Sequence, residues 1–294
     1  MKAATSEYVD VRGLRYRVQR WGDPRAPKLF LLHGWMDVAA SFQFLVDAFD
    51  GDWCVLAPDW RGFGESAWAA GSYLFADYLA DLEALLDHYA PDATANLVGH
   101  SLGGNVACIY AGVRPHRVRR AVSLEGFGIQ RAQPVEAPER YARWLDEQTN
   151  PPRLADYPSL QRVAWRLQKN NPRLTDEQAA FLAQHWVRPG ADGGFVLKAD
   201  PRHKMKSPVL YRLEEAMACW RRVRSPVLWL EGGASPIRSW LKEDDSGFAA
   251  RMQAFADLRH EIVPGAGHML HHDAPQAVAR LLENFVGDNS AAGS

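Results

Sequence analysis

Short apolar runs alternate with helix-like stretches along most of this chain, and no other feature constrains its fold as strongly. Lys28–Leu32 carries four consecutive apolar residues, which is typical of a strand buried on both faces of a parallel sheet. Similar runs occur at Trp53–Ala57, Ala95–Val98, Val118–Leu124, Val227–Leu230 and, more weakly, Glu261–Val263. Between the runs, apolar residues recur at three- and four-residue spacing, as in helices that pack on a core. The alternation predicts parallel β-α-β units and an α/β sheet.

This alternation stops between residues 126 and 224. Helix-like segments occur there at 138–147 and 159–168, and a third begins at Thr175, where Thr175 and Gln178 have capping-box spacing. No buried strand run separates them, so the sequence predicts a mostly helical insertion. Its four tryptophans either pack inside the insertion or line an apolar pocket; they are Trp144, Trp165, Trp186 and Trp220.

The domain organisation follows from this interruption. We expect an α/β core at residues 1–125 and 225–287, a helical cap at residues 126–224, and a flexible tail of small and polar residues at 288–294. Before the first buried run, Tyr8–Val11 and Leu14–Gln19 flank Arg12-Gly13, which predicts an antiparallel hairpin.

Charge and cysteine content exclude several function classes. The 294 residues include 34 Lys and Arg against 35 Asp and Glu, a net charge of -1, which argues against a broad nucleic-acid footprint. The three cysteines are widely spaced and match the pattern of neither a disulfide framework nor a zinc ribbon. With no signal-like start and no apolar stretch long enough to span a membrane, we expect a cytoplasmic protein.

The most specific chemical signal is Gly99-His100-Ser101-Leu102-Gly103, which lies between an apolar strand run and a helical pattern. A tight strand-to-helix turn lifts the serine oxygen clear of the sheet, and the flanking glycines leave room for that turn. The string alone is common, but this context predicts a nucleophilic Ser101.

Two further glycine-containing loops supply the partners that such a serine needs. His33-Gly34-Trp35 follows the first buried strand, so the backbone amides of Trp35 and Leu102 are expected to form an oxyanion hole. We expect His33 itself to shape the loop. Gly265-Ala266-Gly267-His268 follows the last strand and places His268 where a general base is required.

Other polar groups near these loops receive structural interpretations. In the loop from Asp59 to Ser66, Asp59 and Arg61 are expected to pair or to bind loop amides. His271 and His272 are interpreted as ordinary helix-start or surface histidines. Together with Asp273 they suggest a metal site, but no spaced acidic or histidine partner supports it, and none is predicted.

These motifs together resemble the α/β-hydrolase fold, of the type with a helical cap inserted after the sixth core strand. The resemblance covers nearly the whole chain and is weakest in the cap; cap-bearing esterases, lipases and serine-hydrolase-like proteins match best. Epoxide hydrolases and haloalkane dehalogenases share the fold but use an aspartate where this chain has Ser101. The resemblance therefore argues against both of those activities.

The acid of the expected triad departs from the family pattern. The usual aspartate follows the strand Val227–Leu230, but this chain reads Glu231-Gly232-Gly233-Ala234-Ser235-Pro236 there. In some relatives the acid follows the earlier strand, here Val118–Leu124, which Glu125 directly follows. We therefore expect the triad to consist of Ser101, Glu125 and His268. Glu231, Asp244 and Asp245 remain alternative acids.

The resemblance implies a cofactor-independent serine hydrolase that cleaves a carboxylic ester through an acyl-enzyme. The aromatic-rich cap favours a small-molecule substrate with an apolar acyl part. Hydrolysis of an amide, a thioester, a lactone or the C–C bond of a diketone stays open. So does a non-catalytic ligand-binding role, because fold does not fix function. No metal or cofactor is expected, and the sequence leaves the oligomeric state open.

Overall fold

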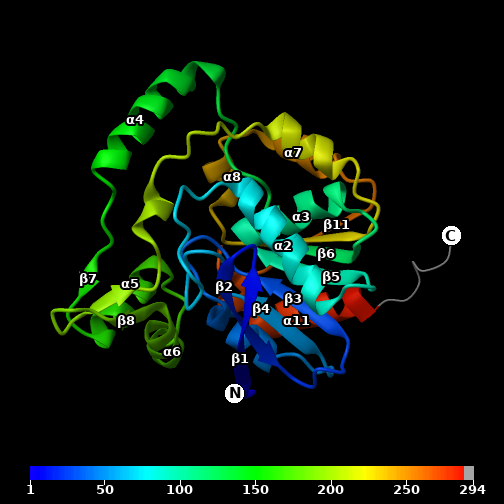
Figure 1. Cartoon of the computed structure of the whole chain (residues 1–294). Helices are drawn as coiled ribbons and strands as arrows, with labels where there is room; N and C mark the ends of the chain where they lie inside the picture. Colours follow the sequence, from blue (N-terminus) through cyan, green and yellow to red (C-terminus); the bar gives the residue numbers. More distant parts are fainter. Residues whose placement is uncertain (288–294) are drawn as a thin grey trace.

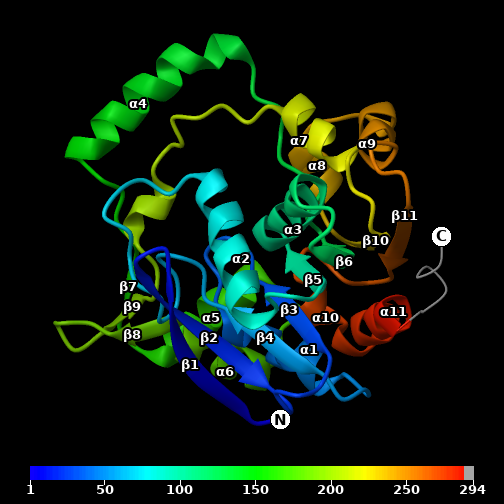
Figure 2. The same cartoon turned by 45° about the vertical axis from the view of Figure 1, so that its right-hand side comes forward.

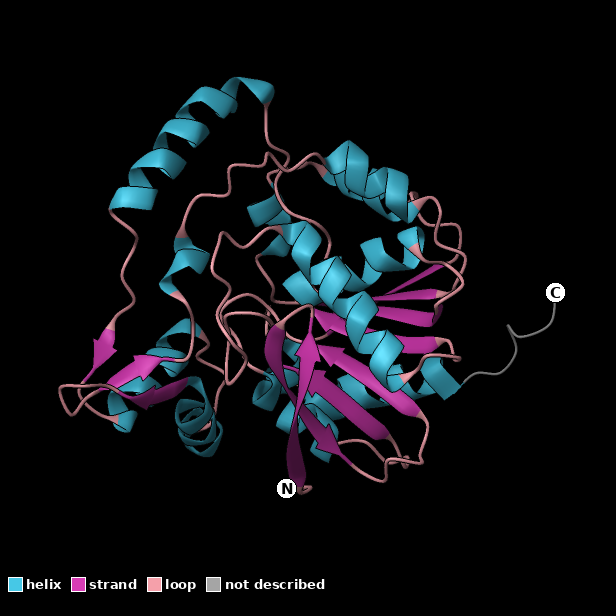
Figure 3. Ribbon diagram, in the orientation of Figure 1, coloured by secondary structure: helices cyan, strands magenta, loops and turns pink. Residues whose placement is uncertain are grey.

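Eight strands form one sheet in the computed structural model, which describes residues 1–287 (Figure 3). Their order is β1-β2-β4-β3-β5-β6-β10-β11; β2 pairs antiparallel with β1 and β4, and the remaining pairs are parallel. The strands are β1 (Ala4–Val11), β2 (Leu14–Trp21), β3 (Lys28–Leu32), β4 (Cys54–Pro58), β5 (Ala95–His100), β6 (Val118–Leu124), β10 (Val227–Gly232) and β11 (Leu258–Val263). The predicted α/β sheet is confirmed, and the tail expected at 288–294 lies outside the described residues.

Helices cover both faces of this sheet (Figure 1). They are η1 (Ala39–Phe42), α1 (Gln43–Asp47), α2 (Phe75–Tyr89), α3 (Leu102–Val113), α8 (Ile237–Leu241), α9 (Asp245–Met252), α10 (Leu270–Asp273) and α11 (Pro275–Gly287). Side chains alternate between two core clusters along each central strand: Phe30 packs with residues of α2 and α3, whereas Leu31 packs with residues of α1 and α11. Both are at most 1% exposed, which explains why this strand is apolar at consecutive positions.

Residues 126–224, which we call the inserted segment, follow β6 and add no strand to the main sheet. They contain η2 (Pro134–Glu136), α4 (Ala137–Thr149), β7 (Asp156–Tyr157), α5 (Leu160–Asn170), α6 (Asp176–Trp186), β8 (Val187–Pro189), β9 (Phe195–Leu197), η3 (Pro201–Lys204) and α7 (Leu213–Trp220). The capping box expected at Thr175 is present at the start of α6. The small sheet β7-β9-β8 was not predicted, because its strands are two or three residues long and largely unburied.

The two ends of the inserted segment differ in how they contact the core. Helix α4 has no buried residue and stands away from the main sheet in both views (Figures 1 and 2). Helix α7 packs on α3, and its Trp220 is fully buried in the main core. Trp165 is 45% exposed, so the four tryptophans do not share one role.

No helix within residues 1–287 combines the length and the apolar character that crossing a lipid bilayer requires.

Candidate active site

Ser101 occupies a sharp bend between β5 and α3. Strand β5 ends at His100 and α3 begins at Leu102, so Ser101 alone turns the chain, with φ of 50° and ψ of -111°. Such a backbone is strained for a residue with a side chain and persists because its surroundings hold it. The Ser101 N–H donates to the Leu124 carbonyl at 2.8 Å. A Cβ at Gly103 would lie 2.0 Å from the Leu32 carbonyl oxygen, so this turn requires glycine there.

The loop after β3 lies directly against this bend. A Cβ on Gly34 would be 3.4 Å from Ser101 Cβ, which places the Gly34–Trp35 backbone beside the nucleophile candidate. His33 Nε2 accepts the Trp60 N–H at 2.9 Å, and His33 Nδ1 lies 2.7 Å from the Gly34 carbonyl oxygen. Burial lowers the pKa of His33. His33 therefore binds loop backbone as expected.

Glu125 and His268 meet at the same edge of the sheet. Glu125 follows β6 with φ of 60°, and its Oε2 lies 3.1 Å from His268 Nδ1. The Glu125 side chain is fully buried, whereas that of His268 is 21% exposed. Glu125 Oε1 accepts the Gly232 N–H at 2.6 Å, and Oε2 accepts the Ser235 hydroxyl. Ser235, which stands where the family pattern has an aspartate, thus contacts the Glu125 carboxylate.

The three alternative acids have other partners. Glu231 binds Arg238 and His260; burial raises the pKa of Glu231, but the hydrogen bonds from His260 and Arg238 outweigh it and lower the pKa to about 2. Asp244 caps α9 by accepting the Gly247 N–H, and Asp245 is fully exposed. Among the four carboxylates, Glu125 is the one that contacts His268 within the described part of the chain.

The His268 loop is also attached to the strand that carries Ser101. His100, the residue before Ser101, places Nε2 at 2.9 Å from the His268 carbonyl oxygen. The Trp240 and His268 rings form a T-shaped pair with centroids 5.0 Å apart, and Trp240 is 52% exposed. The structure therefore brings Ser101, Glu125 and His268 to the carboxyl end of the sheet.

In the loop after β4, Asp59 binds amides and does not pair with Arg61. Asp59 accepts the N–H groups of Ala39 at 2.7 Å and of Glu65 at 2.9 Å. Arg61 instead makes a bidentate pair with Asp81 on α2. Of the two expectations for this loop, the structure shows the amide contacts.

His271 and His272 lie at the start of a helix, α10, as one of the two expectations had it, but the other expectation, a surface position, is wrong. They are 0% and 3% exposed because the short helix α10 packs against η1 and α1. The sequence analysis also missed Asp37, which lies near His100 and His271. Burial holds the pKa of both His100 and His271 well below the usual range, so both rings are neutral at pH 7.

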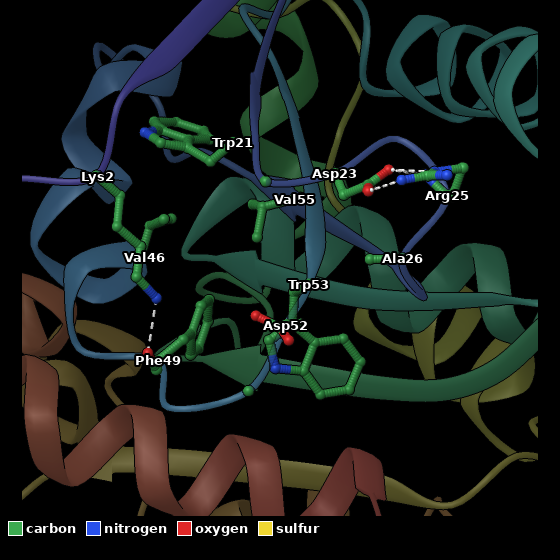
Figure 4. Close-up of a pocket in the computed structure, with 12 residues that line it drawn as sticks. Lys2, Trp21, Asp23, Arg25, Ala26, Val46, Phe49, Asp52, Trp53 and Val55 are labelled. Carbon is green, nitrogen blue, oxygen red and sulfur yellow. Dashed lines mark hydrogen bonds and ion pairs between the residues drawn. The ribbon is translucent and has the colours of Figure 1, made fainter.

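A groove of about 610 Å³ lies elsewhere (Figure 4). Trp53 and Ala26, which line it, precede β4 and β3, so the groove is at the amino ends of the parallel strands. Ligands of open α/β sheets bind at the carboxyl ends, where Ser101 lies. We therefore place the candidate active site at Ser101 and not in this groove.

Comparison with known proteins identifies the family. A family model for the alpha/beta hydrolase fold matches residues 27–275. The chain belongs to this family. This alpha/beta hydrolase is 26% identical to a serine hydrolase-like protein of Danio rerio, over 99% of this chain and 91% of the relative.

Two other matches extend over nearly the whole alpha/beta hydrolase. It is 26% identical to epoxide hydrolase A of Mycobacterium tuberculosis, over 98% of this chain and 99% of that protein. A solved structure of a hypothetical protein from Pseudomonas aeruginosa is 25% identical, with a TM-score of 0.85, over 96% of this chain and 99% of that one. These relatives support hydrolase activity at a coarse level.

Proposed function

We propose that this alpha/beta hydrolase cleaves carboxylic esters with Ser101 as nucleophile, His268 as general base and Glu125 as the acid of the triad. The contact of 3.1 Å between Glu125 Oε2 and His268 Nδ1 carries the proposal. A carboxylate at Nδ1 fixes the ring so that Nε2 is left to take a proton, and it stabilises the imidazolium that forms.

The reaction proceeds in two stages. As Ser101 Oγ attacks the ester carbonyl carbon, its proton passes to His268 Nε2, and the carbonyl oxygen becomes an oxyanion. The amides of Trp35 and Leu102 stabilise that oxyanion, and Gly34 beside Ser101 supports this placement. His268 then protonates the leaving alcohol, and an acyl-enzyme remains. Water, deprotonated by His268, attacks the acyl carbon, the bond from that carbon to Ser101 Oγ breaks, and His268 returns the proton to Oγ as the acid leaves.

Exposed aromatic residues support a substrate with an apolar part. Trp35 follows Gly34 in the loop beside Ser101, Trp240 lies against His268, and both are 52% exposed. Exposed tryptophans next to a reactive centre provide apolar contact area for a ligand. In this proposal, residues 126–224 act as a cap over the core. Ser101 stands in the place of the aspartate that epoxide hydrolases use, so epoxide hydrolysis is not proposed.

Removing the Ser101 hydroxyl tests this function. We expect Ser101→Ala to lower kcat on a p-nitrophenyl acyl ester by at least about 10³-fold, because no other group replaces the nucleophile. The variant should keep the far-UV circular dichroism of the wild type. Ser246→Ala, at an exposed serine on α9, serves as the matched control and should retain full activity.

A fluorophosphonate probe separates catalysis from ligand binding alone. The probe should label wild-type protein at Ser101, and the label should be absent from Ser101→Ala. Full ester turnover by Ser101→Ala, or a wild-type protein that the probe does not label, would contradict the proposed function.

A further inference from the structure

Three buried side chains from distant parts of the chain converge behind the Ser101 bend. Asp37 lies in the loop after β3, His100 ends β5, and His271 belongs to α10. Each offers one ligand atom, and these three atoms lie within 4.8 Å of one another. The residues are 3%, 2% and 0% exposed, respectively. Two imidazoles and one carboxylate are donors typical of a zinc site.

The hydrogen bond of His100 determines which of its nitrogens is free to bind. The His268 carbonyl oxygen can only accept, so His100 Nε2 at 2.9 Å carries the proton. His100 Nδ1 therefore presents a lone pair, and no described group donates to it. A Cβ on Gly34 would lie 2.8 Å from this nitrogen, so the glycine keeps space open beside Nδ1.

His271 has no hydrogen-bond partner at either ring nitrogen within residues 1–287, although its side chain is fully buried. Buried polar atoms almost always have a hydrogen-bond partner, and leaving one without any destabilises the folded state. The His271 ring stacks obliquely on Phe42 and faces the His100 ring, with centroids 4.5 Å apart. Two neutral imidazoles with free nitrogens thus lie side by side.

The Asp37 carboxylate accepts hydrogen bonds from neighbouring groups, as metal-binding carboxylates commonly do. Oδ1 accepts the Val38 N–H at 2.9 Å and the Trp186 indole N–H at 3.0 Å, and Oδ2 accepts the Ser41 hydroxyl at 2.8 Å. Such outer hydrogen bonds orient a ligand and leave oxygen lone pairs for an ion. A small cavity of about 10 Å³ borders Asp37 and Trp186.

We propose that Asp37, His100 and His271 bind one divalent transition-metal ion of the zinc class. The nitrogen donors favour Zn²⁺, Co²⁺ or Ni²⁺ over Mg²⁺ and Ca²⁺, which prefer oxygen ligands. Zinc ligands at about 2.1 Å from the ion stand at most about 4.2 Å apart, so the three side chains close slightly around it.

The bound ion acts on structure and takes no part in ester chemistry. A cation on His100 Nδ1 makes the Nε2–H a stronger donor to the His268 carbonyl, because it withdraws electron density from the ring. The ion therefore links three distant parts of the chain and stabilises the folded state. The contacts of the three metal ligands do not depend on the proposed ester hydrolysis, and metal binding is measured without an ester substrate.

Metal titration of the full chain tests the site. After EDTA treatment and desalting, the protein should bind one Zn²⁺ per chain by isothermal titration calorimetry, and Mg²⁺ should give no heat. Zinc at about 100 times its Kd should raise Tm by about 5 °C. Co²⁺ should give the visible absorption of a four- or five-coordinate nitrogen and oxygen site.

Variants identify the ligands. His271→Phe, which keeps a ring against Phe42, and Asp37→Asn should each lose the stoichiometric zinc and the Tm shift. His88→Ala, at an exposed histidine on α2, is the matched control and should keep both. The proposed site is refuted if wild-type protein binds no stoichiometric zinc or if Co²⁺ keeps the spectrum of the hexaaqua ion. Zinc binding that persists in His271→Phe also refutes it. The cobalt spectrum decides even where a variant fails to fold.

Discussion

The Ser235 hydroxyl donates to the Glu125 oxygen that also faces His268 Nδ1. The Gly232 N–H donates to the other carboxylate oxygen. Donors from the end of β10 and from the loop after it therefore orient the carboxylate of Glu125, which follows β6. A serine at this position lacks the charge of the family's usual aspartate, but it can position a carboxylate that arrives from the neighbouring strand. We interpret Ser235 as a positioning residue for Glu125.

Exchanging the acid between these two positions tests that interpretation. Glu125→Gln should lower ester kcat by up to about 10⁴-fold, because a neutral amide neither fixes the His268 tautomer nor stabilises its protonated form. The double variant Glu125→Gln/Ser235→Asp should have a kcat at least about tenfold higher than Glu125→Gln alone, because its new carboxylate lies at the usual family position. Stopped-flow or steady-state kinetics on the p-nitrophenyl ester measures both.

A neighbouring carboxylate provides the control for this exchange. Glu231→Gln removes a charge that binds Arg238 and His260 and should leave kcat within about twofold. Wild-type kcat in Glu125→Gln would show that another group serves as the acid.

The loop after β4 and the inserted segment are connected by backbone hydrogen bonds. The Gly64 N–H donates to the Lys198 carbonyl at 2.8 Å, and the Asp200 N–H donates to the Gly62 carbonyl at 2.8 Å. The Asp200 carboxylate, 1% exposed, accepts the Tyr73 hydroxyl at 2.7 Å and pairs with Arg202. One buried carboxylate thus ties the loop after β9 to the core.

Removing this carboxylate should loosen the inserted segment. Asp200→Ala removes the acceptor of the Tyr73 hydroxyl and the carboxylate partner of Arg202, which keeps backbone carbonyls as acceptors, so we expect a loss of about 2 kcal/mol in the free energy of unfolding. Urea denaturation measures that loss. Hydrogen exchange should accelerate at residues 62–64 and 195–204. The exposed Asp192→Ala, in the turn between β8 and β9, should change neither quantity; unchanged exchange in Asp200→Ala would refute the role of the carboxylate.

His203 connects the inserted segment to the rest of the protein: it belongs to the inserted segment, but its ring packs between two aromatic rings outside that segment. Its ring stacks on Phe63 and Tyr73, with centroids 3.8 Å and 3.7 Å away, and its Nε2 lies 3.0 Å from the Arg61 carbonyl oxygen. Burial lowers the pKa of His203 to about 3. The titratable and charged groups around it are His33, Arg61, Tyr73, Tyr78, Asp200 and Arg202.

This contact should make stability depend on pH. The unfolded histidine, with a pKa near its usual 6.5, binds a proton below that pH, whereas folded His203 does so only near pH 3. Stability is therefore complete above about pH 6.5 and falls as the pH drops towards 3. Between pH 7 and pH 5, the free energy of unfolding should fall by about 2 kcal/mol less in His203→Phe than in the wild type, as urea titrations at the two pH values measure. Equal losses would contradict this assignment.

The sequence predicted most of the sheet and part of the site, for identifiable reasons. Strands β3 to β6 and β10 are buried on both faces, so their continuous apolar composition is enough to predict them. Ser101 and His268 were predicted from the glycines that flank them in tight turns. The proximity of Asp37 to His271 and the burial of His271 were not predicted, because both depend on how α10 packs on η1, and more than 200 residues separate these two elements in the chain. The fold was confirmed, whereas the triad remains a proposal.

The half-exposed indole of Trp240 has a practical consequence, since it packs directly against the His268 ring. Any molecule that settles above that imidazole must cover this indole or displace it. Subtracting the emission of Trp240→Phe from that of the parent chain isolates one fluorophore among the 11 tryptophans. Trp240 thereby offers a built-in optical signal for screening compounds for binding, independently of turnover.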